Sequence, residues 1–151
     1  MRLQCHSSAV SLVLPGFGLG RADAAVTAMK QSIAAASSAD PEIAAFYRAR
    51  DFKPIFVSQA DGRRRGALLR ALSSVNDHGL PAGRYDGAAL RAVFGNARTA
   101  KARGAAEVEA ARLFLNYADD LRSGVVNPAD IDRSIVVEVP RYDRTQTLHD
   151  F

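Results

Sequence analysis

The chain of 151 residues has no tryptophan and a single cysteine. Because that residue, Cys5, lies close to the N-terminus, the rest of the chain can form no disulfide and offers no thiolate metal site or cysteine nucleophile. Long hydrophobic runs are missing as well. The apolar run Ala9–Leu14 is far shorter than the roughly 20 residues of a membrane-spanning helix. The sequence therefore predicts a fold held by packing, with no membrane-spanning segment.

Grouped metal ligands and nucleophiles are also lacking. The three histidines, His6, His78 and His149, are far apart in sequence and form no pair at helical spacing. The glycines at 16, 18 and 20 follow no strand, so they form no phosphate-binding loop. No Gly-x-Ser-x-Gly turn occurs for a serine nucleophile. We therefore expect no catalytic residue, no metal site and no cofactor in this chain.

Two adjacent carboxylates, Asp119 and Asp120, are the nearest approach to a catalytic acid pair. On a helix they point about 100° apart, so they cannot share a proton as paired catalytic carboxylates do. Surface ion pairing along the helix is the simpler expectation, for instance Asp119 with Arg122 or Asp120 with Arg112.

Basic residues exceed acidic ones, which gives a formal charge of +4 and an isoelectric point near 9.6. They are spread along the chain and interleaved with acidic residues, which is typical of an ordinary solvated surface. Local clusters occur at Arg63–Arg65, expected in a loop that opens a helix, and at residues 98–104, expected to form a linker between helices. Such clusters can bind nucleic acid or another anionic polymer. A small basic binding protein is therefore an alternative function for this chain. Few aromatic residues flank the clusters, so nucleic acid is the less favoured partner.

The first 24 residues differ from the rest. Arg2 precedes the short apolar run, and Ala22-Asp23-Ala24 has the small-x-small pattern of a cleavage site. This arrangement predicts a secretory signal peptide over residues 1–24, and an irregular N-terminus is the alternative. Export would place the mature chain in the periplasm.

High alanine content and helical spacing of apolar residues predict a mainly α fold, a compact scaffold of about five helices. The expected helices lie at about 25–39, 41–50, 65–78, 86–96 and 107–123. Asp40 and Asp86 are the expected caps of the second and fourth helices, and Gly79 is the expected left-handed stop of the third. The last helix has an expected buried stripe of Val108, Ala111, Leu115, Ala118 and Leu121 or Arg122. Short extended segments are expected near 55–57 and 135–139. The predicted domain covers residues 25–140, followed by an irregular or truncated tail at 141–151.

Four motifs in order carry a resemblance to a known family. They are Phe46-Tyr47 through Pro54-Ile55-Phe56, Ala67-Leu68-Leu69 through Leu72, His78-Gly79-Leu80 with Tyr85, and Phe114 through Tyr117 and Gly124 to Pro128. Over about residues 43–140 the chain resembles the N-terminal scaffold domain of large murein L,D-transpeptidases. The resemblance implies a helical periplasmic domain that supports a separate catalytic domain, which cross-links peptidoglycan through a cysteine thioester.

The catalytic pattern of that family, a histidine followed by a Ser-His-Gly-x-Cys-like run, does not occur in this chain, and the surroundings of Cys5 do not match it. We therefore expect a non-catalytic scaffold associated with peptidoglycan cross-linking and cell-wall biogenesis. Its expected partner is a catalytic transpeptidase domain or peptidoglycan itself. A truncated gene product, one half of a split enzyme and a free-standing domain all agree with the sequence.

Overall fold

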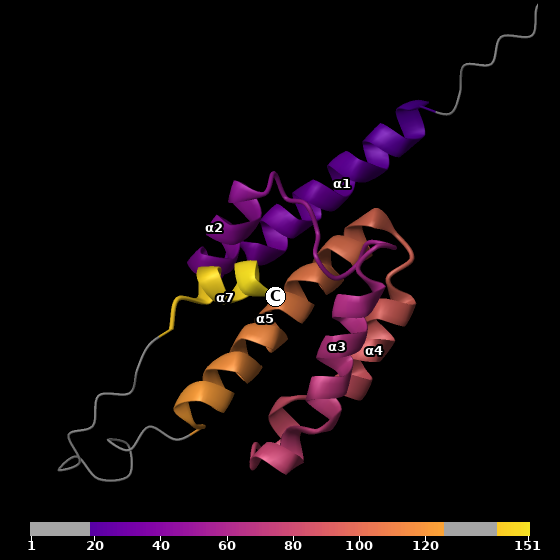
Figure 1. The fold of residues 1–151 in the computed structure, drawn as a ribbon. Helices are drawn as coiled ribbons and strands as arrows, with labels where there is room; N and C mark the ends of the chain where they lie inside the picture. Colours follow the sequence, from indigo (N-terminus) through magenta and orange to yellow (C-terminus); the bar gives the residue numbers. More distant parts are fainter. Residues whose placement is uncertain (1–18, 126–141) are drawn as a thin grey trace, which may run out of the picture.

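A computed structural model describes residues 19–125 and 142–151 (Figure 1). Within these residues the chain forms six α-helices and no strand, which confirms the predicted mainly α fold. The helices are α1 (Leu19–Ser37), α2 (Pro41–Ala49), α3 (Gly62–Ser73), α4 (Gly87–Asn96), α5 (Ala100–Ser123) and α7 (Arg144–Asp150). Two short 3-10 helices, η1 (Val75–His78) and η2 (Ala82–Arg84), connect α3 to α4.

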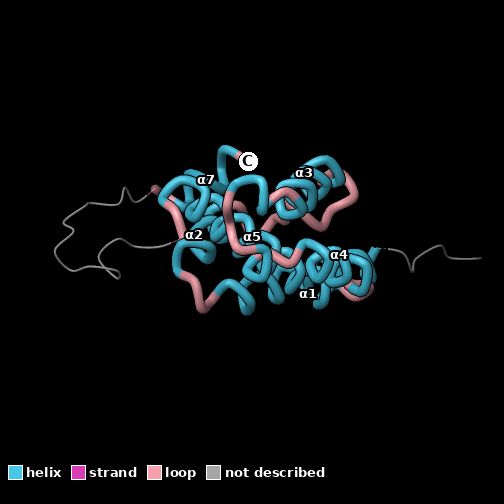
Figure 2. The backbone as a smooth tube through the Cα atoms, turned by 90° about the horizontal axis from the view of Figure 1, so that it is seen from below, coloured by secondary structure: helices cyan, strands magenta, loops and turns pink. Residues whose placement is uncertain are grey.

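Helix α5 lies at the centre of the fold, and the other helices pack around it (Figures 1 and 2). In Figure 1, helices α1, α2 and α7 lie on one side of α5, and the pair α3 and α4 lies on the other. The predicted stripe on this helix is buried at Val108, Ala111, Leu115 and Ala118. Leu121, which was expected to complete the stripe, is instead 46% exposed.

The first turn of α5 corrects the prediction of a linker at residues 98–104. Thr99 caps the helix by accepting a hydrogen bond from the Ala102 N–H at 3.0 Å, so the helix begins at Ala100. Gly104 is buried against α1, where the Ser32 hydroxyl donates to the Lys101 carbonyl at 2.6 Å. The small residues that indicated a linker are in fact what allows the two helices to approach closely.

Several predicted helix ends are confirmed. The Asp40 carboxylate accepts from the Glu42 and Ile43 N–H groups at 3.1 and 3.2 Å, and Asp86 accepts from Ala89 at 2.7 Å. Gly79 ends η1 in the left-handed conformation, with φ of 70°, as expected for the residue after His78.

The segment after α2 is irregular. Asp51 and Phe52 both have φ of 54°, and Pro54 follows within two residues, so the chain leaves the helix sharply. Residues 55–57 were expected to be extended; they bury Ile55 and Phe56 but pair with no strand in the described part of the chain. The other expected extended segment, 135–139, lies outside the described residues.

The C-terminal residues correct the prediction of an irregular tail at 141–151. Asp143 caps α7 by accepting from the Gln146 N–H at 3.0 Å, and Leu148 is buried in the core. The Phe151 ring packs 4.3 Å from the Phe114 ring and 5.5 Å from the Phe56 ring, measured between centroids. Only one strongly apolar residue lies within α7, so the sequence had too little periodicity to indicate a helix.

Candidate functional site

The most unusual feature of the core is a fully buried glutamate on α5, Glu107. Its carboxylate accepts hydrogen bonds from the N–H groups of Ile55, Phe56 and Val57 at 2.6, 2.9 and 2.9 Å. It also accepts from the Tyr47 hydroxyl at 2.7 Å. One side chain therefore supplies the acceptors that a neighbouring strand would otherwise provide to this irregular segment.

The same segment is held by three more side chains. The buried Asp61 carboxylate accepts from the Ser58 N–H at 3.2 Å and also from the Ser58 hydroxyl. Arg65 donates to the Phe56 carbonyl at 2.6 Å, and Arg103 donates to the Val57 carbonyl at 2.7 Å. Residues 55–58 and the four side chains that hold them form what we call the loop clamp. The four side chains are Glu107, Asp61, Arg65 and Arg103.

Burial raises the pKa of the Glu107 carboxyl, and its four hydrogen-bond donors act in the opposite direction. Because all four partners are donors, the site is built for the ionised carboxylate, which can only accept. The charge is thus used to hold the backbone in place. From the sequence, Glu107 was predicted only to be the first residue of a helix, and no local pattern indicated that it is buried.

A hollow of about 640 Å³ lies beside the loop clamp. Three arginines line it, Arg65 from α3, Arg98 from the α4–α5 connection and Arg103 from α5. Its other lining residues are Val57, Ser58, Gln59, Phe94, Gly95 and Ala97. The fold thus brings together members of two basic clusters that lie more than thirty residues apart in the sequence.

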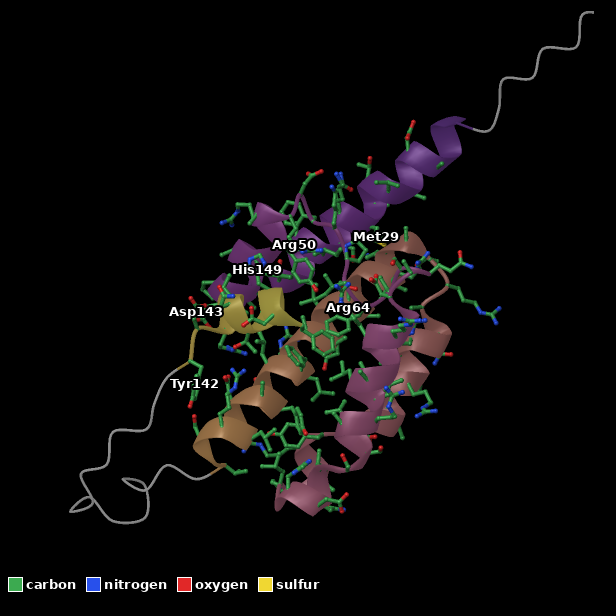
Figure 3. All side chains as sticks on the ribbon, viewed as in Figure 1. Met29, Arg50, Arg64, Tyr142, Asp143 and His149 are labelled. Atoms are coloured by element: carbon green, nitrogen blue, oxygen red, sulfur yellow. The ribbon has the colours of Figure 1, made fainter. Side chains whose placement is uncertain are left out.

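The cluster Arg63–Arg65 was expected in a loop but lies in the first turn of α3. Its members have different surroundings. Arg64 lies 3.3 Å from the Asp61 carboxylate and donates to the Phe151 carbonyl at 3.3 Å, so it faces the C-terminal residues (Figure 3). Only Arg65 reaches the hollow. The three arginines therefore do not converge on a single anion.

Asp119 and Asp120 do not form the predicted pairs with Arg122 and Arg112. Asp119 lies 3.3 Å from Nε of Arg144, the first residue of α7. Asp120 accepts from the Tyr85 hydroxyl and lies 3.2 Å from a guanidinium nitrogen of Arg84. Both carboxylates therefore tie distant parts of the chain to α5, which spacing along one helix does not reveal.

The arginines of α5 have other partners than those predicted. Arg112 pairs with Glu109 at 2.9 Å, and Arg122 donates to the Thr147 hydroxyl at 2.9 Å.

The histidines do not lie together. His78 ends η1, and the His149 ring packs on the Phe46 ring with centroids 5.0 Å apart (Figure 3). Cys5 and His6 lie outside the described residues. In residues 19–125 and 142–151, no group of His, Cys, Asp or Glu could hold a metal ion.

A family model described as a scaffold domain matches residues 41–151. The chain belongs to this scaffold-domain family. The match begins at the first residue of α2 and includes α7, in agreement with the packing of α7 into the core. No curated protein and no solved structure matches the chain. In the described ranges, the scaffold domain has no helix long and apolar enough to cross a membrane.

Two tyrosines of the scaffold domain should resist ionisation at alkaline pH. Burial, followed by the nearby Glu107 carboxylate, raises the pKa of Tyr47 well above its ordinary value. Burial and the hydrogen bond to Asp120 raise the pKa of Tyr85. In the unfolded chain both phenols ionise near pH 10, at about the ordinary value. The raised pKa values of Tyr47 and Tyr85 therefore stabilise the folded state fully below about pH 10. This stabilisation is lost as the pH rises toward the pKa values that the two phenols have in the folded state.

An alkaline titration followed by tyrosinate absorbance should therefore show two of the four tyrosines ionising late, together with loss of helix. The variants Y47F and Y85F should each remove one late step. Ionisation of all four tyrosines in one step, with the helices still intact by circular dichroism, would contradict the two buried environments.

Proposed function

We propose that this scaffold domain is a non-catalytic part of an L,D-transpeptidase-type system that cross-links peptidoglycan. The observation that carries the non-catalytic role is the loop clamp. Both buried carboxylates of the described residues, Glu107 and Asp61, accept hydrogen bonds from the backbone of residues 55–58. Groups that in an enzyme would be available to substrate are here used to fix an irregular segment.

The transpeptidase context is supported by the order of the sequence motifs and by the scaffold-domain family. The motif residues have structural positions in the core: Phe46, Tyr47 and Phe56 are buried, and Tyr85 joins Asp120 across two elements. A rigid helical body with these residues inside suits a domain that holds a catalytic partner in position. The catalytic cysteine would be supplied by that partner.

Periplasmic location after cleavage of residues 1–24 is part of the proposal. Helix α1 begins at Leu19, so cleavage before Ala25 would remove its first turn and a half. Residues 22–27 are all exposed, and the first fully buried apolar side chain of α1 is Ile33. Removal of the N-terminal tip would therefore leave the α1–α5 contact intact.

The proposal is tested by expressing the full chain in a bacterium with a periplasm, sequencing the N-terminus of the exported product, and supplying it with peptidoglycan. We expect a mature chain that starts at Ala25. Alone it should form no cross-linked muropeptides. When a cysteine-bearing L,D-transpeptidase domain is added, the chain should form a complex with it and increase cross-linking.

Cross-linking by the chain alone would overturn the non-catalytic role. Retention in the cytoplasm, or the absence of any effect on the transpeptidase domain, would overturn the proposed context. Tight, salt-sensitive binding to DNA would instead favour the alternative function as a basic binding protein.

A further inference from the structure

We propose that the arginine-lined hollow beside the loop clamp binds the carboxylate groups of a short acidic peptide segment. The proposal does not depend on the transpeptidase context. It rests on three arginines, from different parts of the chain, that the fold places around one hollow: Arg65, Arg98 and Arg103.

Two of these arginines are fixed in place before any ligand binds. Arg65 donates to the carbonyls of Phe56 and Ser58 at 2.6 and 3.4 Å, and its guanidinium lies 5.7 Å from the centroid of the Phe94 ring. Arg103 donates to the Val57 carbonyl at 2.7 Å. Little side-chain entropy remains to be lost when an anion binds to side chains held in this way.

The positive charge of the hollow is not neutralised by ion pairs. Among the described residues, no carboxylate lies within 4.0 Å of the charged nitrogens of Arg65, Arg98 or Arg103. The partners of Arg65 and Arg103 are neutral carbonyls, which orient a guanidinium group but do not neutralise its charge. Each guanidinium also has five N–H donors, more than these contacts use.

The acidic side chains nearest to this surface have other partners. The Glu107 carboxylate is buried and accepts from the backbone N–H groups of residues 55–57. Asp61 pairs with Arg64 and accepts from Ser58. Arg64 neutralises the charge of Asp61. The three guanidinium groups that line the hollow therefore exceed the single negative charge of Glu107, and the surface is positive overall.

Size and lining favour a carboxylate-bearing peptide over nucleic acid. A volume of about 640 Å³ is enough for a short peptide segment with a few side chains. The only aromatic ring in the lining, Phe94, already has the Arg65 guanidinium over it, so that face is not open to a nucleobase. Guanidinium groups bind carboxylates through two parallel hydrogen bonds, and the apolar lining beside them suits the methylenes of glutamate.

The test uses fluorescence anisotropy with the purified chain and a fluorescein-labelled peptide of alternating glutamate and glycine. The same peptide with glutamine in place of glutamate and a short single-stranded DNA are the comparison probes. We expect the glutamate peptide to bind saturably, more weakly as NaCl is raised, and the glutamine peptide not to bind.

The deciding variants are R98E and R91E. Both residues are exposed and carry the same charge, but only Arg98 lines the hollow. We expect R98E to weaken binding of the glutamate peptide about tenfold or more, and R91E to change it by less than about threefold. Because Arg91 and Arg98 are both exposed, both variants should keep the far-ultraviolet circular dichroism spectrum and the melting temperature of the parent chain.

Equal effects of R98E and R91E would show that general surface charge attracts the peptide, and would overturn the site. Binding of the glutamine peptide as tight as that of the glutamate peptide would overturn its carboxylate chemistry. Tighter binding of the DNA, lost in R98E, would reassign the hollow to nucleic acid. A folded R98E variant with the parent affinity would likewise reject the proposal.

Discussion

Replacing Glu107 with alanine is expected to lower the free energy of unfolding by about 3–5 kcal/mol, the largest effect of any single substitution considered for this chain. The change removes the acceptor of the Ile55, Phe56 and Val57 N–H groups and of the Tyr47 hydroxyl. Since the site is fully buried, those donors lose their partner where little water can replace it. The loss is a large part of the roughly 5–15 kcal/mol that stabilises a typical domain.

Glutamine at position 107 should be less damaging, because it keeps the shape and one acceptor oxygen. Its NH₂ group, however, would face a donor of the loop clamp, so a loss of about 2–3 kcal/mol is still expected. Urea unfolding followed by circular dichroism measures both variants, and the order of stability should be parent, E107Q, E107A.

Glu109 provides the matched control, since it lies two residues further along α5. It is exposed, and within residues 19–125 and 142–151 its ion-pair partner is Arg112, at 2.9 Å. An exposed pair of this kind contributes at most about 1 kcal/mol, so E109A should remain close to the parent chain. If E107A and E109A were equally stable, the carboxylate of Glu107 would not be what holds residues 55–57.

Replacing Gly104 with alanine is expected to destabilise the chain by about 2–3 kcal/mol, although alanine is normally the better helix residue. A Cβ atom at this position would lie 2.6 Å from the Ser32 Cβ and 2.8 Å from the Met29 carbonyl oxygen. The carbonyl belongs to the backbone of α1, so the two helices would have to move apart. Valine at the same position should cost more, because it adds two further methyl groups.

Gly95 in α4 is the control for the intrinsic preference of helices for alanine. No atom lies within 4 Å of a Cβ built on Gly95, so G95A should be neutral or stabilising by about 0.5–1 kcal/mol. Thermal unfolding should therefore show a lower melting temperature for G104A and an unchanged or higher one for G95A. A gain in stability for G104A would mean that α1 does not pack closely on α5.

Local signals in the sequence predicted much of the helical framework. Asp40 and Asp86 were recognised as caps because a short carboxylate before a helix can accept from its free N–H groups, and both do so. Gly79 was recognised as a stop because glycine adopts positive φ without a steric cost. These features depend on neighbours within four residues, so the sequence displays them directly.

The errors have a common physical origin. Residues 98–104 contain small and basic side chains, which are typical of a linker, yet Gly104 is small because α1 crosses there. The tail at 141–151 looked irregular because α7 depends on packing of Leu148 and Phe151 against the other helices. In both cases the deciding contact involves residues that are distant in the sequence.

The sequence by itself determined the helical class of this protein, several of its helix boundaries and the absence of a recognisable catalytic pattern, because these follow from composition, periodicity and short motifs. Only the tertiary structure decided which charges are buried and which meet. Glu107 lies about fifty residues from the backbone it holds, and Arg65 reaches the same hollow as Arg98 and Arg103. Burial and charge convergence depend on packing between helices, and no local pattern records that packing.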